Sequence, residues 1–218
     1  MTNTTDIRLC VILAVIATVL WGCRATQPPS PPSRVPSTQP AENTSARSRE
    51  KALDHFIRGS LHDAKGEYAN AILEYQDALR YDQDPAIHFA LAKDYSLLGK
   101  HALAAQHGRE AVRQDPRNID YRENLASIYL NAFEQEKAIQ EYEQILLIDS
   151  NYTNAWYALA RLYQPTRPMK ALELYDRLID REGESWDLLL QTAEISAALE
   201  RWDQAADRYR QLLALDPG

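Results

Sequence analysis

Five histidines, which could act as metal ligands or acid–base groups, gather in one stretch of the chain. They are His55, His62, His88, His101 and His107. A protein metal site needs three or four ligands that converge on one ion. His55 and His62 are seven residues apart, on one face of a helix, and His88 lies 33 residues after His55. We interpret them as core or surface histidines and predict no metal site and no cofactor, with a metal-binding accessory role as the alternative.

Sequence patterns typical of enzymes do not occur in the chain. It contains no phosphate-cradling glycine-rich loop, no HExxH pattern and no GxSxG pattern. Its 31 acidic and 24 basic residues leave a net charge of -7, which works against the phosphate attraction that nucleic-acid binding requires. We therefore predict neither an enzyme nor a nucleic-acid-binding protein.

The two cysteines, Cys10 and Cys23, both belong to an N-terminal segment that is typical of a secretory signal. Arg8 is its only positive charge, and an apolar run extends from Leu9 to Trp21. Counted to Cys23, the run has 15 residues, or about 22 Å as a helix, while a membrane span needs roughly 20 residues. This length favours a cleaved signal over a permanent anchor.

The end of this segment, Leu20-Trp21-Gly22-Cys23, resembles the bacterial lipobox, in which a small residue precedes a cysteine that is acylated and becomes the mature N-terminus. The resemblance implies a lipoprotein signal peptide over residues 1–23, lipidation (palmitate) of Cys23, and a protein held on the extracytoplasmic face of the cell envelope. Trp21 departs from the usual small or aliphatic residue. An uncleaved signal anchor and a cytosolic protein with an incidental apolar N-terminus remain as alternatives. Arg24 is not the aspartate that retains such lipoproteins at the inner membrane, so the outer membrane is permitted in a diderm source.

Residues 24–51 differ in composition from the sequence on either side. They include six prolines among Ser, Thr, Gln and Asn, a mixture that cannot bury a core. We predict a Pro-rich disordered tether over this range, which in extended polyproline geometry advances about 3.1 Å per residue.

The remaining sequence repeats one helical phrase five times. The phrase begins at Ala71, Ala104, Ala138, Ala171 and Ala205, with spacings of 33, 34, 33 and 34 residues. A fixed period in this range indicates two-helix units that bury their apolar faces against one another. We predict an all-α fold, an α-solenoid of five tandem helix-turn-helix units over residues 52–218. The units are placed at 52–84, 85–118, 119–152, 153–185 and 186–218.

Each unit combines small residues on its first helix with large ones on its second. The small residues, which let the two helices approach, are Gly59, Ala92, Ala126, Ala160 and Ala193. The residues that fill the space beside them are Tyr75, Tyr142, Tyr175 and Tyr209. Asp115-Pro116 and Asp216-Pro217 end two of the second helices. This series resembles the tetratricopeptide repeat, and the resemblance implies a right-handed superhelix that binds a protein or peptide on its concave surface.

Two internal features depart from the repeat. Gly108 stands where the other units have tyrosine, so we expect a gap there and a cost of about 1 kcal/mol in helix propensity. Unit four has a shortened turn with Pro165 and Pro168, which indicates a harmless deletion or a kink in the superhelix.

The resemblance places the partner-binding groove on the outward face of the first helices. The residues carried over are Phe56, Ser60, Phe89, Lys93, Glu123, Asn124, Ser127, Asn131, Tyr157, Arg161, Leu190 and Glu194. One apolar side chain per unit, separated by polar ones, suits a peptide with spaced anchors. The alternative is that the apolar residues pack against neighbouring first helices. The family's clamp for a C-terminal carboxylate is absent, since its places hold Phe56, Ser60, Ala90, Asp120 and Asn124.

The last helix has no following helix to cover it. Its exposed apolar residues are expected to be Tyr209, Leu212, Leu213 and Leu215, although repeat arrays normally end in a polar cap. We predict that this edge contacts a partner or a second copy, giving a possible homodimer; the alternative is a tolerated exposed edge.

The lipobox, tether and repeats together look like bacterial lipoproteins that help to assemble envelope machines, such as the pilotins of pili. We predict a membrane-tethered scaffold that binds a protein or peptide in assembly or maintenance of an envelope complex such as a pilus or secretion system. A self-associating structural lipoprotein and a signal-anchored adaptor are the alternatives.

Overall fold

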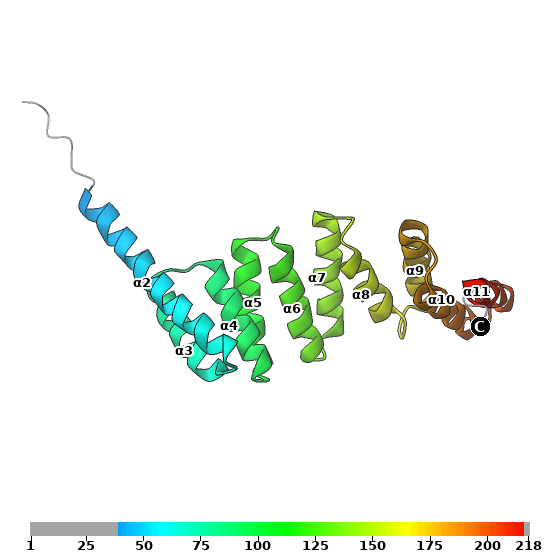
Figure 1. The fold of residues 1–218 in the computed structure, drawn as a ribbon, viewed down its shortest axis with the longest axis horizontal. Helices are drawn as coiled ribbons and strands as arrows, with labels where there is room; N and C mark the ends of the chain where they lie inside the picture. Colours follow the sequence, from blue (N-terminus) through cyan, green and yellow to red (C-terminus); the bar gives the residue numbers. More distant parts are fainter. Residues whose placement is uncertain (1–38, 216–218) are drawn as a thin grey trace, which may run out of the picture. The chain divides into compact units, whose positions relative to one another are not determined.

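The structure is a computed structural model that describes residues 39–215, in which it contains ten α-helices and no strand (Figure 1). The helices are α2 (Gln39–Ala64), α3 (Tyr68–Leu79), α4 (Pro85–Leu97), α5 (His101–Gln114), α6 (Ile119–Asn131), α7 (Gln135–Ile148), α8 (Thr153–Tyr163), α9 (Pro168–Glu182), α10 (Trp186–Ala198) and α11 (Trp202–Leu215). The predicted signal peptide with Cys23, and residues 24–38 of the predicted tether, lie outside the described residues.

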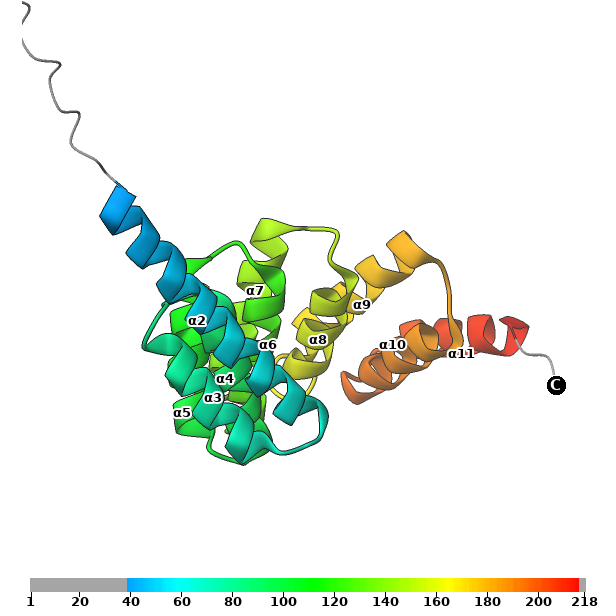
Figure 2. The ribbon, with the colours of Figure 1, turned by 60° about the vertical axis from the view of Figure 1, so that its left-hand side comes forward.

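The helices form hairpins that stack in chain order. From Thr44 onward the chain is one compact unit. Within it α4 contacts α5, α6 contacts α7, α8 contacts α9 and α10 contacts α11, and each second helix also contacts the first helix of the next hairpin (Figure 1, Figure 2). We call the hairpins α2–α3 to α10–α11 units one to five. This arrangement confirms the predicted all-α solenoid.

The core is built from the small residues and tyrosines that the repeat pattern singles out. Ala92, Ala126, Ala160 and Ala193 are fully buried. At Gly59 an added Cβ atom would lie 2.5 Å from the ring of Tyr75, closer than any side chain tolerates. The small residue on one helix therefore makes room for the aromatic ring of the other.

Gly108 leaves no gap, contrary to the sequence-based expectation. It is buried, and a Cβ atom there would lie 3.0 Å from Cδ1 of Leu125 and 3.5 Å from Cδ1 of Ile128. Both aliphatic side chains belong to α6 of the next unit. They occupy the space beside the glycine because the superhelix brings the neighbouring unit against it.

The first helix begins earlier than the sequence analysis predicts. The sequence analysis assigns residues 24–51 to the tether, but residues 39–51 are part of α2. Pro40 is tolerated because it lies in the first turn, where its missing N–H costs nothing. No proline follows until Pro85, and Ala, Glu, Arg and Lys in the intervening stretch favour helix.

The turns within the units require a left-handed residue in several places. Gly66 and Gly99 fill this role in units one and two with φ of 75° and 69°. Phe133 and Glu200 take it in units three and five, both with φ of 59°, a conformation that is strained for residues with a Cβ atom. Phe133 is 95% exposed. In unit four the turn is not shortened, because residues 164–167 separate α8 from Pro168 at the start of α9, one residue more than in the other units. The deletion shortens the helix instead, since α8 has 11 residues and α4, α6 and α10 have 13.

The last helix is the least buried element of the array. Ala205 is the only residue of α11 that is fully buried. No helix in residues 39–215 has both the length and the apolar character that crossing a bilayer requires.

Candidate functional site

All twelve groove residues predicted from the repeat register lie on the first helices of the units. Phe56 and Ser60 are on α2, and their counterparts follow on α4, α6, α8 and α10 (Figure 1). None of the twelve is buried: Lys93, Ser127, Asn131, Arg161 and Glu194 are exposed and the others are half-buried. The first helices therefore present a continuous row of accessible side chains.

The apolar members of this row both pack and line hollows. The Phe56 ring lies 5.4 Å from that of Tyr75, and the Phe89 ring lies 5.1 Å from that of Tyr121 on the next first helix. These contacts hold the rings in place while one side stays accessible. Phe56, Phe89 and Tyr157 each line a separate hollow of the surface.

The first hollow lies between α2 and the start of α4. It has a volume of about 490 Å³ and apolar walls that include Phe56, Leu53 and Ile87. Asp82 and Asp84, from the connection between units one and two, stand at its edge with Arg49 of α2. Asp84 also caps α4, because its side chain accepts a hydrogen bond from the N–H of Ala86 at 2.8 Å.

The second hollow is more acidic. It has a volume of about 850 Å³, and Phe89, Asp120, Glu123 and Asn124 are among its lining residues. Glu123 accepts a hydrogen bond from the hydroxyl of Tyr152 at 2.8 Å. Among the described residues neither Asp120 nor Glu123 forms an ion pair, and the Oδ1 atom of Asn124 has no donor. This lining offers hydrogen-bond acceptors without a balancing cation.

Tyr121, which also lines the second hollow, responds to this acidic surrounding. Burial raises the pKa of its phenol, and the negative charges of Asp84, Asp115 and Asp120 raise it further. Carboxylates from two successive units therefore act on the same point of the groove.

Lys93, on the first helix of unit two, is already paired. Its ammonium donates to Asp63 of α2 at 2.9 Å, which raises the pKa of Lys93. Asp94, the next residue, is fully buried, and neither of its oxygens accepts a hydrogen bond from the described residues. Burial and the neighbouring charge of Asp63 raise the pKa of Asp94 to about 7.

The third hollow, of about 720 Å³, has a different character. Its lining holds a cation as well as a carboxylate, since Arg161 and Asp187 line it together with Tyr157 and Gln191. The hydroxyl of Tyr157 donates to Glu182 at 2.9 Å, and burial with this bond raises the pKa of Tyr157 to about 12. Arg161 has no ion-pair partner in residues 39–215.

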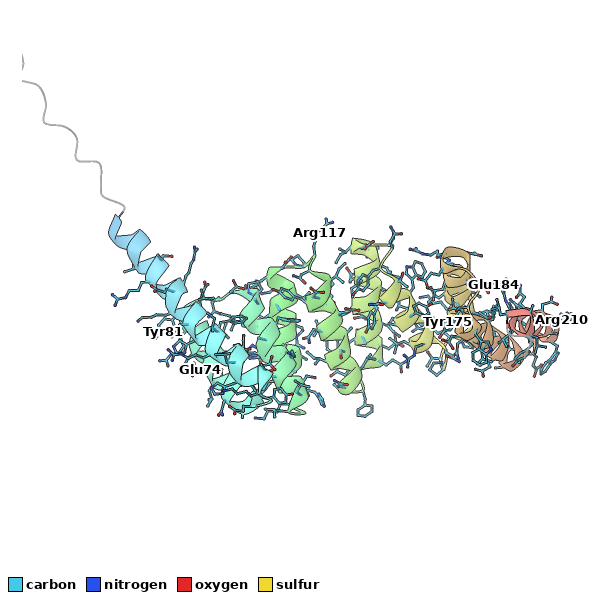
Figure 3. The ribbon with its side chains drawn as sticks, in the orientation of Figure 1. Glu74, Tyr81, Arg117, Tyr175, Glu184 and Arg210 are labelled. Atoms are coloured by element: carbon cyan, nitrogen blue, oxygen red, sulfur yellow. The ribbon has the colours of Figure 1, made fainter. Side chains whose placement is uncertain are left out.

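The histidines do not converge on one point, because His55, His62 and the pair of His88 and His107 have different partners. His55 lies 2.8 Å from Glu74 and stacks on Tyr81, both labelled in Figure 3, and His62 lies 2.6 Å from Glu67. His88 and His107 approach through their Nδ1 atoms at 3.0 Å. Burial lowers the pKa of both members of this pair. Within the described residues no group of three or more His, Cys, Asp or Glu side chains could hold a metal ion.

The predicted C-terminal edge is largely accessible. Tyr209, Leu213 and Leu215 are exposed, while Leu212 is half-buried against the core. The tyrosines at the same position of units one and four are buried. Tyr209 differs because α11 packs mainly against α10, and no other described helix covers its far side.

Several acidic residues of the site were not among the predicted groove residues. Asp82 and Asp84 come from a connection between units, Asp120 and Asp187 come from first turns of helices, and Asp63 lies at the end of α2. The sequence analysis names Asp120 only as the residue at one position of the absent carboxylate clamp. The sequence feature that indicates Asp82 and Asp84 is the Asp-Gln-Asp-Pro run at residues 82–85. Because Asp84 caps α4, this run must lie at the start of a groove helix.

Comparison with known families identifies the repeat. A tetratricopeptide repeat model matches residues 56–119 and 157–218, and a second tetratricopeptide repeat model matches residues 119–152. The chain belongs to the tetratricopeptide repeat family. Proteins with this fold are generally scaffolds for protein–protein interaction and not enzymes.

Curated relatives match over part of their length. Small glutamine-rich tetratricopeptide repeat-containing protein 2 of Saccharomyces cerevisiae is 29% identical over 47% of this chain and 32% of its own. Photosystem I assembly protein Ycf3 of Synechococcus sp. (strain CC9605) is 27% identical over 55% of this chain and 60% of its own. The chain thus spans less than two thirds of each of these relatives.

Solved structures share the fold. The crystal structure of MamA protein has a TM-score of 0.63 at 19% identity and covers 79% of this chain and 92% of its own. A tetratricopeptide repeat protein from Parabacteroides merdae has a TM-score of 0.62 at 23% identity, covering 80% and 68%. The first repeat domain of Spaghetti (RPAP3), solved with the HSP90 peptide SRMEEVD, has a TM-score of 0.51 at 24% identity, covering 54% and 94%.

Proposed function

We propose that this tetratricopeptide repeat protein is a membrane-tethered scaffold that binds a partner protein or peptide on the face formed by its first helices. The partner belongs, in this proposal, to a bacterial envelope complex such as a pilus or secretion system whose assembly or maintenance the scaffold serves. The observation that carries the binding role is the row of accessible side chains on α2 to α10, interrupted by three hollows that are each lined by an aromatic ring.

The relatives support a role in assembly without naming this chain's partner. Ycf3 is an assembly protein by its name, and the Spaghetti domain was solved with a bound peptide. That peptide ends in Glu-Glu-Val-Asp. The clamp places of this chain hold Asp120 and no basic side chain, so a ligand with an acidic C-terminus is unfavourable here.

Membrane tethering rests on the N-terminal sequence. A lipid attached to Cys23 would hold the protein at a bilayer, because each buried methylene group contributes about 0.8 kcal/mol. Residues between Cys23 and α2 then act as the spacer that keeps the repeats clear of the membrane.

A site-specific crosslink tests the binding role. A photoreactive amino acid at Asn131, exposed on the first helix of unit three, should capture a discrete partner when the full chain is expressed in its own cells. The control is the same amino acid at Gln140, which is exposed on the second helix of that unit. Equal capture from both positions, or none from Asn131, would argue against binding on the first-helix face.

The tether has its own test. Cys23→Ser should move the protein from the membrane fraction to the soluble fraction and abolish labelling by fatty acid. Retention of the variant in the membrane would favour the uncleaved signal anchor, and a soluble wild-type protein would exclude both forms of tethering.

Self-association through α11 is a second candidate, favoured by the exposure of Leu213 and Leu215. A homodimer would cover these side chains and gain the free energy of apolar burial. Sedimentation should then show a dimer for the wild-type chain and a monomer for Leu213→Glu. A wild-type chain that is monomeric at tens of micromolar would remove this candidate.

A further inference from the structure

The part of the groove formed by α2, α4 and α6 combines apolar hollows with carboxylates that lack a partner cation. We call it the acidic groove and define it by Phe56, Asp82, Phe89, Asp120 and Glu123. Neither Asp82, Asp120 nor Glu123 takes part in an ion pair within residues 39–215. The basic residues nearby do not pair with them. Lys93 is held by Asp63 at 2.9 Å, and Arg122 is held by Glu141 at 2.7 Å. Arg49 lines the first hollow without forming an ion pair among the described residues.

The acidic groove also provides apolar anchor points at repeat spacing. Phe56 and Phe89 occupy equivalent positions of units one and two, 33 residues apart, and each lines its own hollow. Ring contacts with Tyr75 and Tyr121 fix the two phenylalanines. An extended chain that crosses the first helices would meet an apolar site, then an acidic one, in alternation.

The acceptors of the second hollow select among ligands by charge. Asp120, Glu123 and the Asn124 Oδ1 atom can accept hydrogen bonds but cannot donate them. An acidic ligand would meet repulsion, and a neutral one would leave the carboxylates without compensation when water is displaced. Lys or Arg side chains bring donors and positive charge together, and hydrogen bonds between charged groups are the strong ones.

We propose that the acidic groove binds an extended basic peptide segment, in which Lys or Arg side chains alternate with apolar ones. This proposal rests on the proposed function, because it takes binding on the first-helix face as given and specifies the partner's chemistry. The apolar side chains enter the hollows beside Phe56 and Phe89, and the cations reach Asp82, Asp120 and Glu123. The raised pKa of Tyr121, caused in part by three surrounding carboxylates, agrees with a negative potential at this place.

Binding of labelled peptides to the full chain tests the proposal. The probe is a fluorescent 12-residue peptide in which Lys alternates with Leu and Ala, and two control peptides carry Gln or Glu in place of Lys. Fluorescence anisotropy should show at least tenfold tighter binding for the Lys peptide than for the Gln peptide, and the weakest binding for the Glu peptide. The preference should shrink as the NaCl concentration rises.

Variants then locate the site. Asp120→Asn combined with Glu123→Gln should weaken the Lys peptide at least tenfold and leave the Gln peptide unchanged. Glu173→Gln combined with Asp180→Asn is the matched control, because it removes the same two charges from exposed positions of α9, a second helix outside the groove. It should change the affinity less than twofold. Circular dichroism should show the same helix content for all variants.

Three results would overturn the proposal. The first is equal binding of the Lys and Gln peptides. The second is an equal loss of affinity in the control variant with Glu173→Gln and Asp180→Asn, which would mean attraction to the net charge alone. The third is an unchanged affinity of the variant with Asp120→Asn and Glu123→Gln. If the Asn131 crosslink still captures a partner in these cases, the scaffold function stands and only the peptide chemistry is wrong. If the Lys peptide binds as expected while the crosslink captures nothing, the peptide site stands and the proposed cellular role fails.

Discussion

The first-helix face divides into two regions that share one scaffold and differ in polar chemistry. The second hollow, beside α4 and α6, is lined by Asp120 and Glu123 without a cation, and the ammonium of Lys93 is neutralised by Asp63. The third hollow, beside α8 and α10, is lined by one charge of each sign, Arg161 and Asp187, which form no ion pair among the described residues. The hollows of the two regions, at about 850 and 720 Å³, are similar in size.

The difference shows how a repeat separates stability from recognition. Buried positions such as Ala126 and Ala160 are the same in neighbouring units, because they must fit one packing geometry. Exposed positions such as Ser127 and Arg161 are free to differ, because their side chains do not pack in the core. The fold thus determines where a contact is made, and the residue type determines what is bound.

The largest expected effect separates the first unit from the last. Tyr75→Ala should lower the free energy of unfolding by about 3–5 kcal/mol, since Tyr75 is 2% exposed and its loss leaves a cavity beside Gly59. Tyr209→Ala at the same repeat position should cost no more than about 1 kcal/mol, because Tyr209 is 40% exposed. Urea unfolding followed by circular dichroism measures both. Equal losses would mean that α11 is covered in solution, as in a dimer.

The next effect depends on pH and concerns Asp94, at the position that Ile128 and Ile195 occupy in other units. The folded-state pKa of about 7 lies above the ordinary value of 3.8. As the pH rises, the Asp94 carboxyl therefore loses its proton in the unfolded chain before it does so in the folded protein. The free energy of unfolding thus contains a contribution of about 2–4 kcal/mol that is present below pH 4 and is lost as the pH passes 7.

Asp94→Leu should remove this loss and stabilise the protein at pH 8 by a similar amount. Thermal unfolding between pH 4 and pH 8 measures the change, with Glu194→Gln as an exposed acidic control that keeps the wild-type profile. An unchanged pH profile in Asp94→Leu would show that the Asp94 carboxyl stays ionised at no cost.

A smaller effect concerns the turns. Phe133→Gly should raise the free energy of unfolding by about 1 kcal/mol, because glycine adopts the positive φ without strain. The reverse change, Gly99→Ala, should lower it by about the same amount at an equivalent turn with φ of 69°. Chemical denaturation compares the two, and a destabilised Phe133→Gly would show that the exposed ring has a contact in solution.

The smallest effect extends the acidic groove toward unit four. Arg161→Glu should tighten binding of the Lys peptide about two- to threefold, because it removes the positive charge from the third hollow. Arg177→Glu makes the same change in net charge on the second helix of that unit and should leave binding unaltered. Anisotropy titration of the two variants in parallel decides whether the position or only the total charge matters.

The repeat pattern allowed most of the fold to be predicted, since alanines at a period of 33 or 34 residues report the packing of every hairpin. The start of α2 was misplaced because the Pro-rich composition was extended beyond Pro40, the last proline before the helix. The twelve predicted groove residues do lie on the first helices. The position of Asp82 and Asp84 beside Phe56 was not predicted, because they belong to a connection that only the stacking of units brings there.

What the sequence by itself determined is the number and register of the helices, because each hairpin is held by contacts between residues close in the chain. The tertiary structure alone decided which charges remain without a partner. The Lys93–Asp63 pair joins residues 30 apart, and the contact of Leu125 with Gly108 joins neighbouring units. Such contacts depend on how one unit stacks on the next, and the local pattern of a unit does not contain that geometry.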